Sequence, residues 1–303
     1  MAFSKLSGDE QGIILGQLRN TLEPRLAMYF SSASKELRAL LPAAARQQLQ
    51  ADYEEATALC VKMGMRDCKE LREAMEVECL DEGLCATDLA TLATLGSVLP
   101  ALEGLSLYEP SGSADPDGVS RLAEGLIAGA LPAVTHLAIR RMHVGDAGAS
   151  ALAAALDRGA LPRLDRLLLG HAAIGDAALA ALAPALRRRP GLEELYLHSN
   201  PFGDDGLAAL VAPPPAGTPP PAAGALKKLK LLDLDSTEVT DDGCAALAAA
   251  LDRGALPALL TVGLDRTPAS TAAKEAVSAA LARSRAAAIV SEAKRAARAE
   301  SAA

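Results

Sequence analysis

The sequence predicts an α/β solenoid in which short parallel strands line one side and helices the other, preceded by an all-helical N-terminal module. Two observations predict it. A pattern of one apolar residue, two variable, one apolar, one variable and one apolar recurs six times between Leu99 and Leu264, at spacings of 32, 30, 28, 37 and 30 residues. Each copy is followed by apolar residues at helical spacing. A period of about 30 residues fits one strand and one helix per repeat, each unit burying its neighbour's apolar face.

The copy at 161–190 shows how one unit is built. Gly175 and Asp176 are expected to form a turn and a helix N-cap between the strand and the helix. The strand buries Leu164, Leu167 and Leu169, and the helix buries Leu179, Leu182 and Leu186. The six copies read LEGLSL from Leu102, VTHLAI from Val134, LDRLLL from Leu164, LEELYL from Leu192, LKLLDL from Leu229 and LLTVGL from Leu259.

These units resemble leucine-rich repeats of the ribonuclease-inhibitor-like class, over about residues 99–285. The resemblance implies strands on the inside of an arc and helices on its outside. The family's asparagine, three residues after the last strand leucine, is present only as Asn200, and the matching places hold Met142, Ala172, Thr237 and Thr267. Because an asparagine ladder satisfies backbone groups, we expect an irregular arc. A Pro-rich insert at 212–224 is expected to end the fourth helix and form a solvated loop.

Composition narrows the classes of function. The chain has 303 residues, is 50% hydrophobic and carries a formal charge of −8, which argues against a nucleic-acid partner. It contains neither a long uncharged apolar run nor a secretory leader pattern, so we expect no membrane partner and a cytoplasmic or nuclear location. The five cysteines lack the close pairs of a zinc site, and we expect reduced, buried thiols.

No pattern for catalysis stands out. The sequence has no P-loop, no GxSxG, no HExxH and no dinucleotide fingerprint. The acidic pairs Asp204–Asp205 and Asp241–Asp242 recur at helix starts, where N-capping and the helix dipole explain them better than a metal does. We therefore expect no enzyme, no cofactor and no metal site.

In the N-terminal segment at 1–45, residues 6–40 read LSGDEQGIILGQLRNTLEPRLAMYFSSASKELRAL, in which an acid, an apolar helix, a proline and a Ser34–Lys35 pair follow one another. This order resembles that of an F-box. Ser7 and Leu37 stand where the family has proline and tryptophan. The resemblance implies binding to the adaptor of a cullin-type ubiquitin ligase through Leu6, Ile13, Ile14, Leu18, Pro24 and Leu26.

Two further segments flank the repeats. Residues 46–98 are expected to be a helical cap or linker, with the stretch GMRDCKELREAMEVECL as a charged amphipathic helix. Residues 286–303 are expected to be a basic, Ala-rich tail that frays from a last capping helix.

The strand alternation predicts the binding surface. Because the leucines of each strand face the core, the residues between and beside them face out on the concave side. Tyr108 and Tyr196 are the expected hot spots, because aromatic residues dominate protein interfaces. The full set is Tyr108, His136, Arg140, Arg166, His171, Glu194, Tyr196, His198, Asp233, Asp235 and Asp265.

The sequence leaves two functional hypotheses open. In the first, the chain is a substrate receptor of a ubiquitin ligase, whose N-terminal segment docks the adaptor while the concave face holds a protein target. In the second, it is a stand-alone interaction, inhibitor or GTPase-regulating scaffold, and the N-terminal region only caps the apolar edge of the first repeat.

Overall fold

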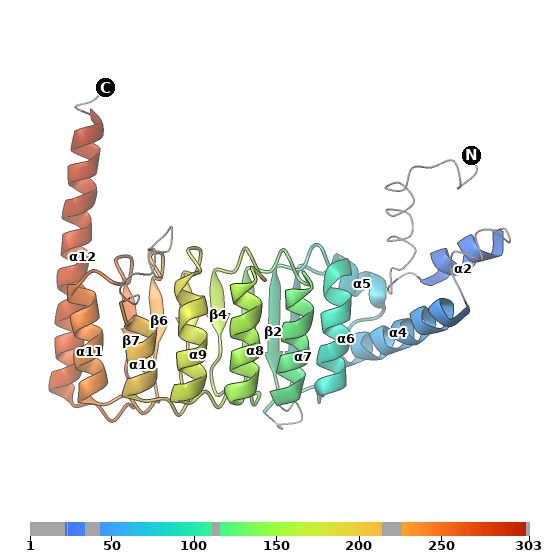
Figure 1. The fold of residues 1–303 in the computed structure, drawn as a ribbon, viewed down its shortest axis with the longest axis horizontal. Helices are drawn as coiled ribbons and strands as arrows, with labels where there is room; N and C mark the ends of the chain where they lie inside the picture. The colour runs from blue at the N-terminus through green and yellow to red at the C-terminus, as the bar shows by residue number, and fades with distance from the viewer. Residues whose placement is uncertain (1–21, 23, 34–42, 111–115, 214–225, 301–303) are drawn as a thin grey trace.

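The computed structural model describes residues 22, 24–33, 43–110, 116–213 and 226–300. Within them one parallel sheet runs in chain order, and a row of helices lies along it (Figure 1). The α/β solenoid is therefore confirmed. The strands are β1 (Glu76–Leu80), β2 (Gly104–Tyr108), β3 (His136–Arg140), β4 (Arg166–Leu168), β5 (Glu194–Tyr196), β6 (Leu231–Asp233) and β7 (Thr261–Gly263).

Each strand is followed by a helix that packs against the next helix along the chain. In order these helices are α6 (Ala86–Leu95), α7 (Pro116–Ile127), α8 (Gly145–Asp157), α9 (Asp176–Arg187), α10 (Asp204–Val211), α11 (Asp241–Asp252) and α12 (Thr271–Glu300), and the 3-10 turn η2 (Gly96–Val98) follows α6. N-terminal to the sheet lie α2 (Pro24–Ala33), α4 (Ala43–Lys62) and α5 (Cys68–Glu73).

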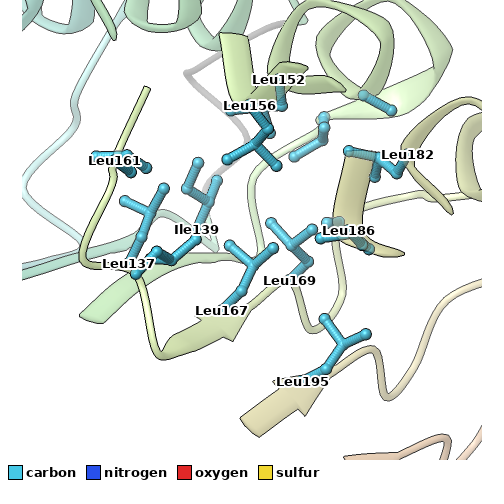
Figure 2. Packing of buried hydrophobic residues seen from close by; sticks show 14 of the residues in the cluster. Leu137, Ile139, Leu152, Leu156, Leu161, Leu167, Leu169, Leu182, Leu186 and Leu195 are labelled. Atoms are coloured by element: carbon cyan, nitrogen blue, oxygen red, sulfur yellow. The ribbon is translucent and has the colours of Figure 1, made fainter. Parts of the chain in front are cut away.

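The core is a continuous layer of leucines between the sheet and the helices. Figure 2 shows Leu137, Leu167 and Leu195 on neighbouring strands, facing Leu156 and Leu182 from the helices. All five are buried. Burying a leucine side chain contributes about 1.5–3 kcal/mol, so the repeated leucines hold the array together by the hydrophobic effect.

The structure adds a strand that the sequence analysis missed. The stretch expected as a charged amphipathic helix before residue 81 is instead the short helix α5 followed by β1, which pairs in parallel with β2. The expectation of a helical segment throughout 46–98 is therefore wrong at β1. Ala74, Val77 and Cys79 take the places that leucines hold in the next repeat, and Val77 and Cys79 are buried with period two, as in a strand.

The aspartates at the helix starts were expected to cap their own helices, but they bond to the next repeat instead. Gly175 and Gly203 are the N-cap residues of α9 and α10, and neither has a capping side chain. Asp176 instead reaches the next repeat, where its Oδ1 accepts hydrogen bonds from the backbone N–H groups of Gly203 and Gly206, both at 2.8 Å. The aspartate therefore satisfies free donors at the start of its neighbour's helix rather than its own.

The same bond recurs twice toward the C-terminus. Asp204 accepts from the N–H and the hydroxyl of Thr240, at 2.8 and 2.5 Å. Asp241 accepts from the N–H and the hydroxyl of Ser270, at 2.6 and 2.9 Å, and these bonds lower the pKa of its carboxyl. We call these three aspartates, Asp176, Asp204 and Asp241, the clasp aspartates.

Asn200 is buried and bonds to the backbone of two repeats. Its side-chain oxygen accepts from the N–H groups of Ala172 and Ile174, and its nitrogen donates to the carbonyls of Leu169 and Leu197. In the next two repeats the hydroxyls of Thr237 and Thr267 donate to the carbonyls of the residues just after β6 and β7, Leu234 and Leu264, at 2.7 and 2.9 Å. Threonine thus replaces part of what asparagine does.

Several predicted segments lie partly or wholly outside the described residues. Leu6, Ile13, Ile14 and Leu18 lie outside the described residues, as do residues 214–224 of the Pro-rich insert. Pro24 is the first residue of α2, and Leu26 lies within that helix. α10 ends at Val211, just before the insert.

The C-terminal segment is one long helix. α12 continues to Glu300 and projects past the other helices (Figure 1). Residues 286–300, expected as a tail, are thus helical. No helix in the described part of the chain is long and apolar enough to cross a membrane.

Candidate protein-binding surface

The outward positions of the strands form one surface, which we call the strand face. It consists of the residues that alternate with the buried leucines, both along each strand and in the first three residues after it. In β5, Leu195 is fully buried, while Glu194 and Tyr196 on either side remain partly exposed. None of the eleven residues predicted for this surface is buried, and the strand pairing sets them side by side across β2 to β7.

The predicted residues come from six strands and the loops after them. Tyr108 ends β2, His136 and Arg140 begin and end β3, and Arg166 begins β4. Glu194 and Tyr196 flank the centre of β5, and Asp233 ends β6. The remaining four, His171, His198, Asp235 and Asp265, lie two or three residues after the ends of β4, β5, β6 and β7.

Two arginines surround Tyr108. The guanidinium carbons of Arg140 and Arg141 lie 5.7 and 5.9 Å from the centre of its ring, within range of a cation–π interaction. Arg140 also donates to the hydroxyl of Ser106, at 3.4 Å. Arg141 follows β3 with a φ of 53°, so the chain turns away from the strand at this residue.

His136 and His171 share this positive environment. Burial and the charge of Arg166 lower the pKa of His136, although Asp165 and Glu76 oppose the shift. Burial and the charge of Arg141 also lower the pKa of His171. Both imidazoles are therefore largely neutral near pH 7, and the lasting positive charge here comes from the arginines.

Near β5 and β6, His198 contacts both another histidine and an acidic residue. The rings of His171 and His198 lie edge to face, 5.8 Å apart. His198 Nδ1 lies 3.1 Å from Asp233 Oδ2. A side chain at Gly170 would overlap the His198 ring, so the glycine makes room for this histidine beside the loop after β4.

Asp233 and Asp235 hold the backbone at the C-terminal end of the strand face. Asp233 accepts from the N–H of Asp235 at 3.0 Å, and Asp235 accepts from the N–H of Asp265 at 2.8 Å. Burial works to raise the pKa of Asp233, but contact with His198 and the backbone bond outweigh it and lower that pKa. The carboxylate is therefore charged at neutral pH.

The centre of the strand face is partly apolar. Leu168 and Tyr196 lie side by side in the pairing of β4 with β5, and both are half-buried. The Tyr196 hydroxyl donates to Glu194 Oε2 at 3.1 Å, which fixes the direction of the ring. A partly exposed tyrosine beside a leucine offers an anchor for a partner.

Sequence reasoning missed part of this surface. Glu76, Glu78 and Leu80 face outward on β1, with Leu80 53% exposed. Their alternation with Val77 and Cys79 was the signal, hidden by the absence of leucines. Arg141 was missed because it lies one residue beyond the regular alternation, where only the turn after β3 brings it to Tyr108.

The cysteines lie away from the strand face. Cys60, Cys68, Cys79 and Cys244 are buried free thiols, and Cys85 is half-buried. The Sγ atoms of Cys60 and Cys68 are 3.8 Å apart, and burial raises the pKa of the Cys60 and Cys79 thiols to about 12. These thiols therefore stay protonated and poorly reactive. In the described part of the chain no cluster of three histidine, cysteine or acidic side chains could hold a metal ion.

Comparison with known families identifies the repeat. Residues 192–211 and 225–248 match the family described as Leucine Rich repeat. The array is built from leucine-rich repeats. The matched segments contain β5 with α10 and β6 with most of α11, so each covers a strand and the helix of the same leucine-rich repeat.

Three solved structures are similar to this chain, each at 16% identity. The actin-binding site 2 of leiomodin-1 has a TM-score of 0.45 and covers 60% of this chain and 96% of its own. A Bacteroides fragilis protein has a TM-score of 0.45 and covers 75% and 68%. An internalin from Listeria monocytogenes has a TM-score of 0.37 and covers 75% and 66%. No curated protein matches the sequence.

Proposed function

We propose that this chain is a protein-binding scaffold whose strand face holds a protein partner. The observation that carries the proposal is the strand face itself, on which polar, aromatic and charged side chains stay partly or fully exposed across neighbouring strands. Rigid repeats hold such side chains in fixed positions, which lowers the entropy lost on binding. The repeat length and the helix in each unit support the ribonuclease-inhibitor-like class.

Site-specific crosslinking tests this proposal. A photo-crosslinking side chain at Glu194 of the full chain should capture a protein from native lysate, whereas one at Arg158, exposed at the end of α8, should not. Capture should weaken when Tyr196 is replaced by alanine. The matched control is Tyr29→Ala, because Tyr29 is 71% exposed on α2, outside the strand face. Equal capture from both crosslinker positions, or equal loss in both tyrosine variants, would overturn the proposal.

The finer proposal is a substrate receptor of a cullin-type ubiquitin ligase. The F-box-like order of residues 6–40 ahead of the leucine-rich repeats supports it, and Pro24 at the start of α2 agrees with the family's helix-breaking proline. The alternative is a stand-alone interaction, inhibitor or GTPase-regulating scaffold with a capping N-terminal region. In either case we expect the chain to act in the cytoplasm or the nucleus.

A pull-down separates these two possibilities. The wild-type chain and a variant carrying Leu6→Ala and Ile14→Glu are compared in native lysate, with mass spectrometry of the bound proteins. Cullin and adaptor subunits that bind the wild type and are lost with the variant support the receptor. Other proteins bound equally to both forms, without ligase subunits, support the stand-alone scaffold.

A further inference from the structure

The sign of the charge on the strand face changes along the array. Glu76 and Glu78 on β1 are acidic, the end of β3 and the start of β4 are basic, and the ends of β6 and β7 are acidic again. The whole chain carries a formal charge of −8, so a basic region in its middle departs from the average. A local reversal of this kind acts on the orientation of a partner more than on raw affinity.

The basic region is weakly neutralised within the protein. In the part of the chain that the structure describes, Arg140 and Arg141 form no ion pair, and their nearest partners are a hydroxyl and the Tyr108 ring. Arg166 Nε lies 3.6 Å from the buried Oδ1 of Asp165, and Arg166 pairs with Glu194 across β4 and β5. Arg140 and Arg141 are thus available to a ligand, and Arg166 is only partly neutralised, because its contact with Asp165 is longer than a hydrogen bond.

In the acidic region, the side chains of Asp233 and Asp235 already make contacts within the protein, whereas that of Asp265 is exposed. Asp233 contacts His198, and both Asp233 and Asp235 accept backbone bonds, while Asp265 remains exposed. The charge of Arg266 also acts on Asp233 and helps to lower its pKa. The region at the ends of β6 and β7 therefore keeps net negative charge.

Leu168 and Tyr196 lie between the two charged regions. Adjacent strands are about 4.8 Å apart, so β3 and β7, separated by four such steps, lie roughly 19 Å from each other. A helix rises 1.5 Å per residue, so about thirteen residues of helix span that distance.

We propose that the strand face binds a bipolar helical segment of a protein partner. The segment lies across the strands with its carboxylates over Arg140, Arg141 and Arg166, an apolar side chain on Leu168 and Tyr196, and its cations over Asp235 and Asp265. This inference rests on the proposed function, because it names the chemistry of the partner that the strand face takes. A uniformly acidic segment would meet repulsion at β6 and β7, and a uniformly basic one at Arg141 and Arg166.

Two helical peptides of equal composition test the proposal on the full chain by fluorescence anisotropy. Each has about sixteen residues, a length that covers the span of the charged regions. In the block peptide, four glutamates precede an apolar centre with leucines and four lysines follow it. In the mixed peptide, glutamates and lysines alternate along the helix around the same centre. The block peptide should bind at least tenfold more tightly, and the difference should shrink in high salt because the charges are screened.

Charge-reversal variants, each with a matched control, test where on the strand face the peptide binds. Arg141→Glu with Arg166→Glu should weaken the block peptide at least tenfold, since both side chains are exposed and removing them leaves the core intact. Arg158→Glu with Arg163→Glu changes the net charge equally, at exposed positions off the strand face, and should leave binding unchanged. Asp265→Lys should weaken the block peptide and strengthen an all-glutamate peptide. Far-UV circular dichroism and thermal melting confirm that each variant is folded.

The outcomes separate this inference from the proposed function. Equal binding of the block and mixed peptides, or equal losses in the two double variants, overturns the bipolar segment. Crosslinking at Glu194 would still capture a protein in that case if the strand face is the binding surface. Loss of that capture overturns the proposed function and this inference together.

Discussion

The two halves of the array join their repeats in different ways. From α6 to α8 the helices approach closely over glycines, whereas from α9 to α12 carboxylates reach from one repeat to the next. At Gly125 in α7, a side chain would overlap the Cβ of Ala93 in α6. At Gly206 in α10, an added Cβ would instead lie 2.8 Å from the carboxylate of Asp176.

Glycine therefore has two roles in one fold. In the N-terminal half it allows direct contact between helix backbones, which adds dispersion energy but tolerates no added methyl group. In the C-terminal half it leaves space for a clasp aspartate, whose hydrogen bonds satisfy the free N–H groups at the next helix start. Neighbouring helices therefore pack side by side in both halves of the array, although different contacts hold them together.

The largest expected loss of stability is common to both halves of the array. Leu137→Ala in β3 and Leu232→Ala in β6 should each lower the free energy of unfolding by about 2–5 kcal/mol, because each removes a buried side chain from the common core. Urea denaturation followed by circular dichroism measures both. A loss confined to one variant would mean that the two halves do not share one core.

The second effect belongs to the N-terminal half. Gly125→Ala should destabilise the chain by about 1–3 kcal/mol, because its Cβ would overlap the Cβ of Ala93 in α6. Gly175→Ala is the matched control, since a Cβ at Gly175 meets no atom within 4 Å. Similar denaturation curves for the two variants would show that α6 and α7 do not depend on this close approach.

The third effect belongs to the C-terminal half. Asp204→Ala should cost about 0.5–2 kcal/mol, as loss of a helix cap does, because it removes both bonds to Thr240. Asp146 occupies the equivalent place in α8, and the described structure gives it no such bond, so Asp146→Ala should change stability little. Equal changes in thermal stability for these two variants would contradict the distinction between the halves.

The smallest effect is a response to acid. Hydrogen bonds from Ser270 lower the pKa of Asp241 in the folded chain below its usual value of about 3.9. The unfolded chain therefore takes up this proton first, and the stability from Asp241 is present above pH 4 and lost as the pH falls through the folded pKa. Thermal melting between pH 6 and 3 should show a shallower decline for Asp241→Asn than for the wild type. An identical decline would assign the acid response to other carboxyls.

The fold was largely predictable because it depends on a pattern that repeats along the chain. Leucines at fixed spacing gave the strands from β2 to β7 and the helices after them. β1 escaped because Val77 and Cys79 replace leucines, and only period two marks it as a strand. The clasp aspartates escaped for another reason: a capping rule is local, while Asp176 acts on residues 27 and 30 positions further along the chain.

The strand face was predictable as far as the alternation extends. Alternation tells which side chains of a strand face outward, and it identified Tyr196 and its neighbours. It does not tell where a residue at positive φ points, so Arg141 was left out. Nor does it tell which charges are neutralised nearby, because the contact between His198 and Asp233 joins two repeats.

Neighbouring residues in β5 give the most direct test that the strand face is the binding surface. Leu195→Ala and Tyr196→Ala are compared by urea denaturation and by titration with the captured partner. Leu195→Ala should destabilise the chain by about 2–5 kcal/mol. Tyr196→Ala should cost about 1 kcal/mol or less in stability but weaken binding at least tenfold. The reverse result, a large loss of stability from Tyr196→Ala with unchanged binding, would contradict both the strand register and the binding surface.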